Sequence, residues 1–358
     1  MKIAQIAPLY EAVPPRLYGG TERVVAHLTD ALVAQGHEVT LFASADTVTR
    51  ARLVPVRDQA LRLDPTPLKS DLAGHLGMLH QLRAWAGAFD VLHFHIDLLH
   101  FPMFEDLAPR TLTTLHGRLD LKDLPQVYQR WHGYPLVSIS HSQRAPLPEA
   151  NWFGTVYHGL DPSPYRVASR PSGDYLAFLG RISPEKRPDR AIEIARRAGL
   201  PLKIAAKVDA ADRDYFQQTI RPLLDSPLVE FVGEIGDAQK ADFLGNARAL
   251  LFPIDWPEPF GLVMIEAMAC GTPVIAWRQG SVPEVLTQGV TGFIVEDIAQ
   301  AVRAVKQAAA LDRQRIRAMF DRRFTARTMA ENYVTLYRRL LADAPSNDPV
   351  FVENLQRA

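Results

Sequence analysis

Two glutamates stand in a stretch that otherwise has the composition of a hydrophobic core, PEPFGLVMIEAMACGTPVI over residues 257–275. The first, Glu258, lies between two prolines. A residue before proline is disfavoured in the α region, and Pro259 suits a first helical turn, so we predict that a helix begins near Phe260. That helix is apolar on every side except at Glu266, and such helices are buried. Because a buried carboxylate is costly unless it is satisfied, we interpret Glu266 as a ligand-binding group, with a structural ion pair as the alternative.

Two further segments carry residue types that bind phosphate. Gly19, Gly20 and Thr21 follow a predicted strand and precede a predicted helix, where free backbone amides and the positive end of the helix dipole can bind an anion. Arg181 and Lys186 flank the end of another predicted strand, and a guanidinium fork with an ammonium point charge can neutralise a diphosphate. A plain tight turn and ordinary surface charge are the respective alternatives.

Several histidines fall within the predicted N-terminal sheet. His93 and His95 share one strand face, which is compatible with a metal site, but no carboxylate-rich spacing or HExxH helix accompanies them, so we expect no metal. His116 ends a strand, where a polar side chain would face a cleft. The pair Asp212 and Asp214 lies in the first turn of a predicted helix, where acids complement the helix dipole, and we interpret it as structural.

Composition excludes several classes of protein. The 358 residues suggest two domains, and 40 basic residues balance 40 acidic ones, which gives no support to a nucleic-acid partner. The one cysteine, Cys270, leaves no disulfide framework and favours the cytoplasm. The N-terminal apolar run is too short for a signal peptide, and no apolar run reaches 18 residues. Peripheral membrane contact is therefore conceivable but not favoured.

Short β-rich runs alternate with amphipathic patterns along the chain, which is typical of βα units with parallel sheets. A segment rich in Pro, Ser and Gly interrupts the alternation once and indicates a linker. The sequence thus predicts an α/β protein of two doubly wound, Rossmann-like domains facing a central cleft. Helices are expected over residues 21–35, 71–88, 184–198, 210–224 and 238–247.

Together these features resemble the family 4 retaining glycosyltransferases of the GT-B fold, over nearly the whole chain. The matching motifs are E-x7-E at Glu258 and Glu266, G-R-x-x-x-x-K at Gly180, Arg181 and Lys186, and the glycine loop at Gly19 and Gly20. The opening residues are also similar to a bacterial subgroup labelled UDP-glucose:tetrahydrobiopterin glucosyltransferase. The chain departs from the usual motifs at Lys186-Arg187, where Lys-Gly is usual, at His158-Gly159, where Asn-Gly is usual, and at Gly280-Ser281, where Gly-Gly is usual.

The resemblance implies a domain plan in which the C-terminal helix crosses back to the first domain. The expected segments are an acceptor-side domain at 1–160, a linker at 161–173, a nucleotide-sugar-binding domain at 174–325, the returning helix at 326–345 and a tail at 346–358. Acceptor identity would be set by loops of the first domain.

The resemblance also implies a role for each motif residue. Glu266 would accept hydrogen bonds from the ribose hydroxyls and Glu258 would hold the donor sugar, while Arg181 and Lys186 would neutralise the leaving diphosphate. The implied catalytic residues are His116, Arg181, Lys186 and Glu258. The implied donor-binding residues are Gly19, Gly20, Thr21, Gly180, Gly233, Glu234, Ile235, Phe260, Gly261, Leu262 and Glu266.

The implied reaction is transfer of a hexose, expected to be glucose, from a nucleotide sugar, expected to be UDP-linked, to a hydroxyl of a small molecule or glycan. Retention at the anomeric carbon is expected, without a metal or other cofactor. A nucleotide-sugar epimerase or hydrolase of the same fold, or a non-catalytic nucleotide-sugar-binding protein, are the alternatives. The absence of a G-x-G-x-x-G fingerprint disfavours an NAD oxidoreductase.

Overall fold

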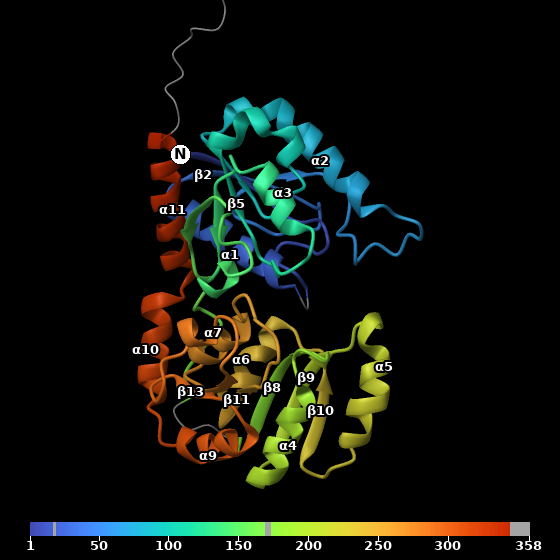
Figure 1. The fold of residues 1–358 in the computed structure, drawn as a ribbon, viewed down its shortest axis with the longest axis vertical. Coiled ribbons are helices and arrows are strands. Elements are labelled where there is room, and N and C mark those ends of the chain that lie inside the picture. The colour runs from blue at the N-terminus through green and yellow to red at the C-terminus, as the bar shows by residue number, and fades with distance from the viewer. Residues whose placement is uncertain (17–18, 169–172, 344–358) are drawn as a thin grey trace, which may run out of the picture.

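Two parallel β-sheets, each covered by helices, make up the protein. A computed structural model describes residues 1–16, 19–168 and 173–343. The strand order is β3-β2-β1-β4-β5-β6-β7 in the first sheet and β10-β9-β8-β11-β12-β13 in the second. We call the parts built on these sheets the N-terminal and C-terminal domains; Figure 1 shows them as two lobes. The predicted α/β class with two Rossmann-like domains is confirmed.

The N-terminal domain reverses its strand order between β1 and β4, which pair in parallel. Ligands of open α/β sheets bind beside such a reversal, at the carboxyl ends of the strands. The strands of this domain are β1 (Lys2–Ile6), β2 (Glu38–Ala43), β3 (Arg52–Pro55), β4 (Val91–Phe94), β5 (Thr111–Thr114), β6 (Leu136–Ser138) and β7 (Trp152–Thr155). Its α-helices are α1 (Gly20–Ala34), α2 (Asp71–Trp85) and α3 (Leu124–Arg130).

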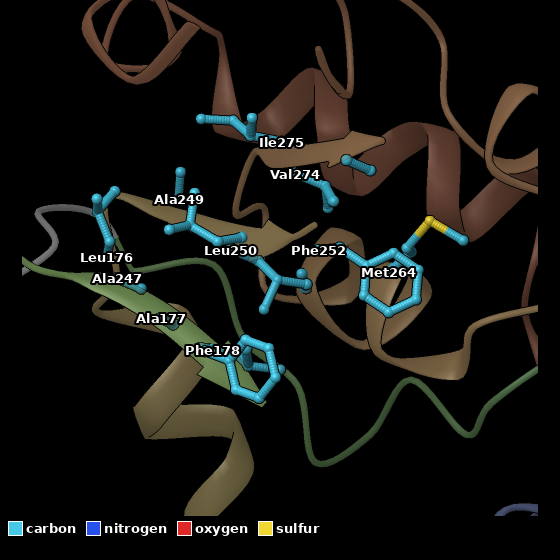
Figure 2. Packing of buried hydrophobic residues seen from close by; sticks show 14 of the residues in the cluster. Leu176, Ala177, Phe178, Ala247, Ala249, Leu250, Phe252, Met264, Val274 and Ile275 are labelled. Atoms are coloured by element: carbon cyan, nitrogen blue, oxygen red, sulfur yellow. The ribbon is translucent and has the colours of Figure 1, made fainter. Parts of the chain in front are cut away.

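The C-terminal domain has the corresponding reversal between β8 and β11. Its strands are β8 (Leu176–Arg181), β9 (Leu202–Lys207), β10 (Val229–Gly233), β11 (Ala249–Phe252), β12 (Val274–Trp277) and β13 (Gly292–Val295). Its α-helices are α4 (Pro188–Ala198), α5 (Arg213–Tyr215), α6 (Asp237–Gly245), α7 (Leu262–Ala269), α8 (Val282–Val285), α9 (Ile298–Ala308) and α10 (Arg313–Arg323). Figure 2 shows the core between these elements, where Met264 of α7 packs beside Phe252 at the end of β11.

One helix prediction for this domain was wrong at its start. The helix expected over 184–198 begins only at Pro188, because Arg187 takes a left-handed conformation with φ 53° and ends the preceding turn. The helix expected over 210–224 is present as one helical run over residues 210–223, in which the hydrogen-bond pattern changes from 3₁₀ to α, then to π at Phe216–Ile220 and back to 3₁₀. Pro222 contributes to this irregularity, because it lacks an N–H for the helical ladder and crowds the carbonyl one turn earlier.

The last helix, α11 (Ala326–Asp343), packs on the N-terminal domain although it follows the C-terminal domain in sequence. Figure 1 shows it beside the N-terminal lobe. Its fully buried Tyr333 and Tyr337 share a core with Val24 of α1 and Val91 of β4. The expected tail at 346–358 and residues 169–172 of the expected linker lie outside the described residues. Within the described ranges, no helix is long and apolar enough to cross a membrane.

Truncation of Tyr337 should show how strongly α11 is bound to the N-terminal domain. We expect Tyr337→Ala to lower the free energy of unfolding by about 3–5 kcal/mol, because a fully buried aromatic side chain is lost. Tyr337→Phe keeps the ring and should cost less. The exposed Arg338 on the same helix is the control, and Arg338→Ala should stay within about 0.5 kcal/mol. Urea unfolding of the full chain measures all three, and equal stabilities would contradict the assignment.

Candidate functional site

A cavity of about 340 Å³ is lined by residues of both domains. Its lining follows the carboxyl ends of β5, β8, β9 and β11, together with the beginnings of α1 and α7. Most sequence-predicted site residues line it, namely Gly19, Gly20, Thr21, His116, Gly180, Lys186, Glu234, Ile235, Glu258, Phe260, Gly261, Leu262 and Glu266. Arg181 and Gly233 are predicted site residues that do not belong to this lining.

Glu266 has the features expected of a ligand-binding group and also those of a structural ion pair. It is 3% exposed, it lines the cavity, and its Oε1 accepts a hydrogen bond of 2.9 Å from Lys240 Nζ of α6. Lys240 also forms an ion pair of 3.3 Å with Asp237. A buried charge persists only when it is paired and hydrogen-bonded, so Lys240 explains how the carboxylate is tolerated in α7.

Glu258 is 9% exposed and lies in the loop that precedes α7. Its Oε2 accepts hydrogen bonds from Lys186 Nζ and, at 3.0 Å, from Trp256 Nε1. The ammonium of Lys186 lies 5.1 Å from the centre of the Trp256 ring, which adds a cation–π contact. The carboxylate predicted to hold the sugar and the lysine predicted to neutralise the diphosphate are therefore directly bonded to each other at the cavity wall.

Two glycines shape the backbone around Glu258. Gly261 has φ 80°, a left-handed conformation that side chains disfavour, and α7 begins directly after it, later than the sequence predicted. Gly280 has φ 52°, and a Cβ there would lie 2.3 Å from the carbonyl oxygen of Glu258. Ser281 donates its N–H to that same oxygen at 3.0 Å. The Gly280-Ser281 turn therefore fixes the position of Glu258.

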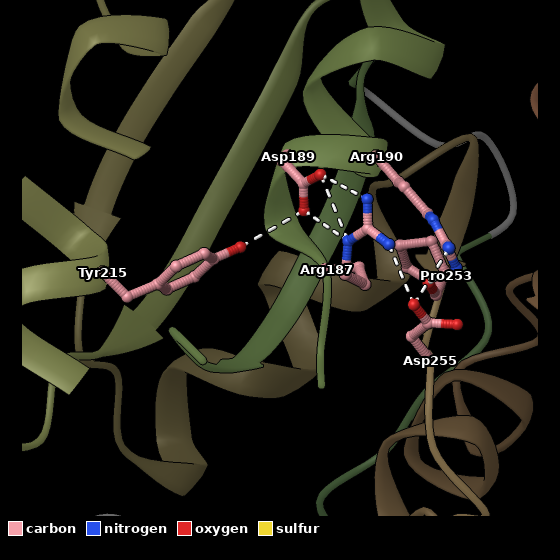
Figure 3. Close-up of polar contacts among 6 residues, drawn as sticks. All are labelled: Arg187, Asp189, Arg190, Tyr215, Pro253 and Asp255. Carbon is pink, nitrogen blue, oxygen red and sulfur yellow. Dashed lines mark hydrogen bonds and ion pairs between the residues drawn. The ribbon is translucent and has the colours of Figure 1, made fainter. Parts of the chain in front are cut away.

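A polar network behind the cavity joins the loop that carries Lys186 to the loop that carries Glu258 (Figure 3). Arg187 bonds Asp189 at 2.7 Å and Asp255 at 2.9 Å. Arg190 bonds the same Asp255 carboxylate at 3.1 Å. Because these bonds span the start of α4 and the end of β11, they limit the separation of the two loops.

Arg181 differs from its expected surroundings. It is the last residue of β8, and its guanidinium pairs with Glu185, with Asp209 at 3.6 Å and with Asp212 at 3.4 Å. The interpretation of Asp212 as a structural acid fits this pairing. To reach a diphosphate in the cavity, Arg181 would have to exchange some of these carboxylate partners, so its catalytic role stays a prediction.

The N-terminal histidines form a buried hydrogen-bonded chain behind His116. The Nε2 atom of His95 lies 2.7 Å from Gln5 Oε1, and its Nδ1 lies 2.9 Å from His116 Nε2. His93 is bonded to Tyr337 of α11 at 2.7 Å. His95 thus lies behind His116 instead of at the cleft. Across residues 1–16, 19–168 and 173–343, no group of three or more His, Cys, Asp or Glu side chains could hold a metal ion.

Comparisons with known proteins identify the family. The model described as "Glycosyltransferase Family 4" matches residues 18–182, and the one described as "Glycosyl transferases group 1" matches residues 166–323. A D-inositol 3-phosphate glycosyltransferase of Streptomyces scabiei is 36% identical over 337 residues, which cover 78% of this chain and 75% of that protein. The chain belongs to glycosyltransferase family 4. The predicted family is confirmed, and the protein is a glycosyltransferase.

Other similar proteins agree with this family. A glycogen synthase of Mycobacterium tuberculosis is 26% identical, over 91% of this chain and 93% of that protein. The crystal structure of AviGT4, a glycosyltransferase involved in avilamycin A biosynthesis, is 27% identical with a TM-score of 0.75, covering 96% of this glycosyltransferase and 98% of AviGT4. The structure of Anabaena HepE in complex with UDP-glucose has the same fold at 18% identity and a TM-score of 0.71, covering 95% of this chain and 100% of that one.

The sequence interpretation missed all the apolar residues of this glycosyltransferase's cavity lining outside the predicted motif positions, and also four polar ones. The polar ones are Arg23, Lys207, Lys240 and His158. Arg23 of α1 forms an ion pair with Asp237 of α6, which joins the two domains at the cavity. Lys207 ends β9 as Arg181 ends β8, so the rule that sites follow the carboxyl ends of strands could have found it. Lys240 and His158 had no comparable signal.

The buried His116 should make this glycosyltransferase sensitive to acid. Burial lowers the pKa of His116 from 6.5 to about 3. Between these two pH values the unfolded chain binds a proton that the folded chain does not, so stability falls as the pH is lowered, by about 1.4 kcal/mol per pH unit for this group. Glu22, whose pKa burial raises to about 7, contributes with the opposite sign, so a difference measurement is required.

We therefore expect His116→Phe to remove the contribution of His116 to the pH dependence of the free energy of unfolding. Urea unfolding of both proteins between about pH 6 and about pH 4.5 should give a free energy that falls less steeply in the variant, by about 1.4 kcal/mol per pH unit. Identical slopes would show that His116 is protonated in the folded protein over this range.

Proposed function

We propose that this protein is a retaining glycosyltransferase that transfers glucose from UDP-glucose to an acceptor hydroxyl. One observation carries the proposal: the two carboxylates of the E-x7-E motif, Glu258 and Glu266, line one cavity together with Gly20 and Thr21 of the other domain. Each carboxylate has a lysine partner in that cavity. Such a constellation suits a ligand that carries hydroxyls at two places and anionic phosphates between them.

The Lys240 end of the cavity is the nucleotide end in this proposal. Glu266 accepts hydrogen bonds from the ribose hydroxyls through its remaining lone pairs, while Lys240 balances its charge. Glu234 and Ile235, which follow β10, contact the base. Hydrogen bonds to an ionised carboxylate are stronger than those between neutral groups. The buried, paired Glu266 can therefore bind the two ribose hydroxyls selectively.

The Glu258 end is the sugar end, and Lys186 lies between the two. In the structure the Lys186 ammonium is bonded to Glu258. A donor diphosphate competes with Glu258 for the Lys186 ammonium. When Lys186 turns to the diphosphate, the Glu258 oxygen can accept a hydrogen bond from a hydroxyl of the sugar. As the bond to the diphosphate breaks, negative charge grows on the leaving oxygen, and a cation placed there stabilises the transition state.

We further propose that the reaction retains configuration and needs no metal. The positive charge comes from the cations that line the cavity, Arg23, Lys186, Lys207 and Lys240. The acceptor hydroxyl attacks from the side of the leaving diphosphate, so that the diphosphate oxygen takes the proton of that hydroxyl as the glycosidic bond forms. His116, which lines the cavity just after the end of β5, is the residue that we assign to this side.

The similar proteins do not identify the donor nucleotide or its sugar, so both are part of the proposal. The resemblance of the opening residues to the subgroup labelled UDP-glucose:tetrahydrobiopterin glucosyltransferase supports UDP-glucose. The HepE neighbour that was crystallised with UDP-glucose is 18% identical and supports the fold only. The relatives' names include transfer to inositol 3-phosphate and to phosphatidyl-myo-inositol, so a polyol or sugar acceptor is the class we propose. We propose a cytoplasmic location on the strength of the single, buried Cys270.

A panel of nucleotide sugars tests the proposed function directly. We expect UDP-glucose to raise the melting temperature more than GDP-mannose or ADP-glucose, and to be hydrolysed slowly in the absence of acceptor. Stabilisation scales with the ratio of ligand concentration to Kd, so equal concentrations rank the donors. A larger rise in melting temperature with another nucleotide sugar would identify that nucleotide sugar as the donor in place of UDP-glucose. Release of an epimeric nucleotide sugar would favour an epimerase, and binding without any turnover would favour a binding protein.

Replacement of the two cations of the diphosphate element separates their roles. Lys186→Ala should lower kcat/KM by about a hundredfold, because the ammonium lies in the cavity wall. Arg181→Ala should have a smaller effect, since its guanidinium is bonded to three carboxylates outside the lining. Steady-state kinetics of donor hydrolysis measures both. A larger loss for Arg181→Ala would show that it does exchange its partners for the diphosphate.

Glu258→Gln tests the assignment of the sugar end. The amide keeps the size of the side chain but removes the charge that accepts sugar hydroxyls, so we expect transfer to fall by at least about a hundredfold. UDP affinity, measured by calorimetry, should stay within about threefold. A parallel loss of UDP affinity would place Glu258 at the nucleotide instead.

A further inference from the structure

His158 occupies an unusual place in the cavity wall. It follows β7 in the N-terminal domain, is 4% exposed and lines the cavity. Its ring stacks on that of His116, with centroids 5.2 Å apart and planes at 19°. It also makes an edge contact with the ring of Phe260 from the C-terminal domain, at 4.9 Å and 63°. The imidazole is therefore packed against aromatic rings of both domains.

The polar atoms of this ring have no partner among the residues that the structure describes. Among residues 1–16, 19–168 and 173–343, neither ring nitrogen of His158 makes a hydrogen bond, and Nδ1 is buried. A buried polar group without a partner loses the free energy of its hydration, so such groups require an explanation. Burial, together with the neighbouring His116, holds the pKa of His158 well below its usual range. The ring is therefore neutral, with one N–H to donate and one lone pair to accept.

The neighbouring His116 has a defined hydrogen-bonding polarity. Because the Gln5 Oε1 atom only accepts, the His95 Nε2 atom must donate to it, and His95 Nδ1 then accepts from His116 Nε2. This leaves a lone pair on His116 Nδ1, which is buried and has no partner among the described residues. Two stacked, neutral imidazoles with unsatisfied nitrogens thus stand side by side in one wall of the cavity.

We propose that His158 is a sugar-binding residue, and that its unpaired imidazole forms a hydrogen bond with a hydroxyl of the transferred sugar beside His116. This inference rests on the proposed function. A hydroxyl both donates and accepts, which matches a neutral imidazole, whereas a phosphate or carboxylate would call for a cation. His158 contacts Phe260, which stands two residues after Glu258, so we assign it to the sugar end of the cavity. Where family members usually carry Asn, this chain therefore has a longer, ring-shaped group, and His158 determines which sugars fit.

The test compares the affinities of UDP and UDP-glucose in variants of His158. We expect His158→Asn to weaken UDP-glucose binding by about tenfold, the usual worth of one neutral hydrogen bond, and to leave UDP within about twofold. The amide of His158→Gln extends further and should restore part of the loss if Nε2 is the contacting atom. Isothermal titration calorimetry gives both constants for the full chain.

His100 provides a matched control. It is also fully buried and stacks on Phe94 at 3.7 Å, and its Nδ1 has no partner in the described part of the chain, although its Nε2 is bonded to Thr113. It does not line the cavity. His100→Asn should lower the melting temperature as His158→Asn does, without changing the ratio of UDP-glucose to UDP affinity. A change of that ratio in His100→Asn, or an unchanged ratio in both His158 variants, would overturn the proposal.

A set of UDP-deoxyglucoses, each lacking one hydroxyl, tests the contact in the unaltered protein. One of them should bind about tenfold more weakly than UDP-glucose, and the same donor should lose nothing further in His158→Asn, because the two changes remove one shared interaction. Additive losses for every hydroxyl would overturn the contact, and His158→Ala serves in the same cycle if His158→Asn fails to fold. If the unaltered protein binds no nucleotide sugar, the proposed function fails; if it binds and hydrolyses UDP-glucose with additive losses, only the role of His158 fails.

Discussion

The arrangement of the cavity depends on the ion pair between Glu266 and Lys240. An ionised carboxylate in an apolar helix is stable only beside a cation, and removal of that cation would leave a buried charge without compensation. Because Lys240 also pairs with Asp237, and Asp237 with Arg23 of α1, the requirement extends from the interior of α7 to the other domain. The charges that a ligand would meet are thus already ordered by one another.

A second network serves the opposite end of the cavity. Lys186 and Glu258 belong to different loops, and the bonds of Arg187 and Arg190 to Asp255 bring these loops together (Figure 3). Arg187 stands where glycine is usual in the family motif. Its left-handed conformation has an energetic cost that a glycine would avoid, and its ion pairs compensate for that cost. The substitution has therefore kept the turn and added a bond across it.

The fold and part of the site could be predicted from sequence because local patterns determine them. The alternation of strand and helix patterns predicted the two sheets. The charge of Glu266 within an apolar helix predicted the cavity, because such a charge can be recognised in the sequence alone. The helix over 210–224 was predicted, but its irregular hydrogen bonding near Pro222 was not, because Pro222 was given too little weight. Lys240 looked like any lysine on a surface helix, and only the packing of α6 on α7 buries it. His158 adjoins a linker, and its environment is created by contact between domains.

The polypeptide passes between the domains twice, and the two passages lie side by side. Leu160 donates its N–H to Phe324 and accepts one from Ala326, at 2.9 and 2.8 Å, and Gly159 lies so close to Thr325 that a Cβ would come within 2.3 Å of its carbonyl oxygen. Two adjacent connections that are hydrogen-bonded to each other have the geometry of a hinge. A rotation about this hinge would change the distance between the two domains at Arg23 and Asp237.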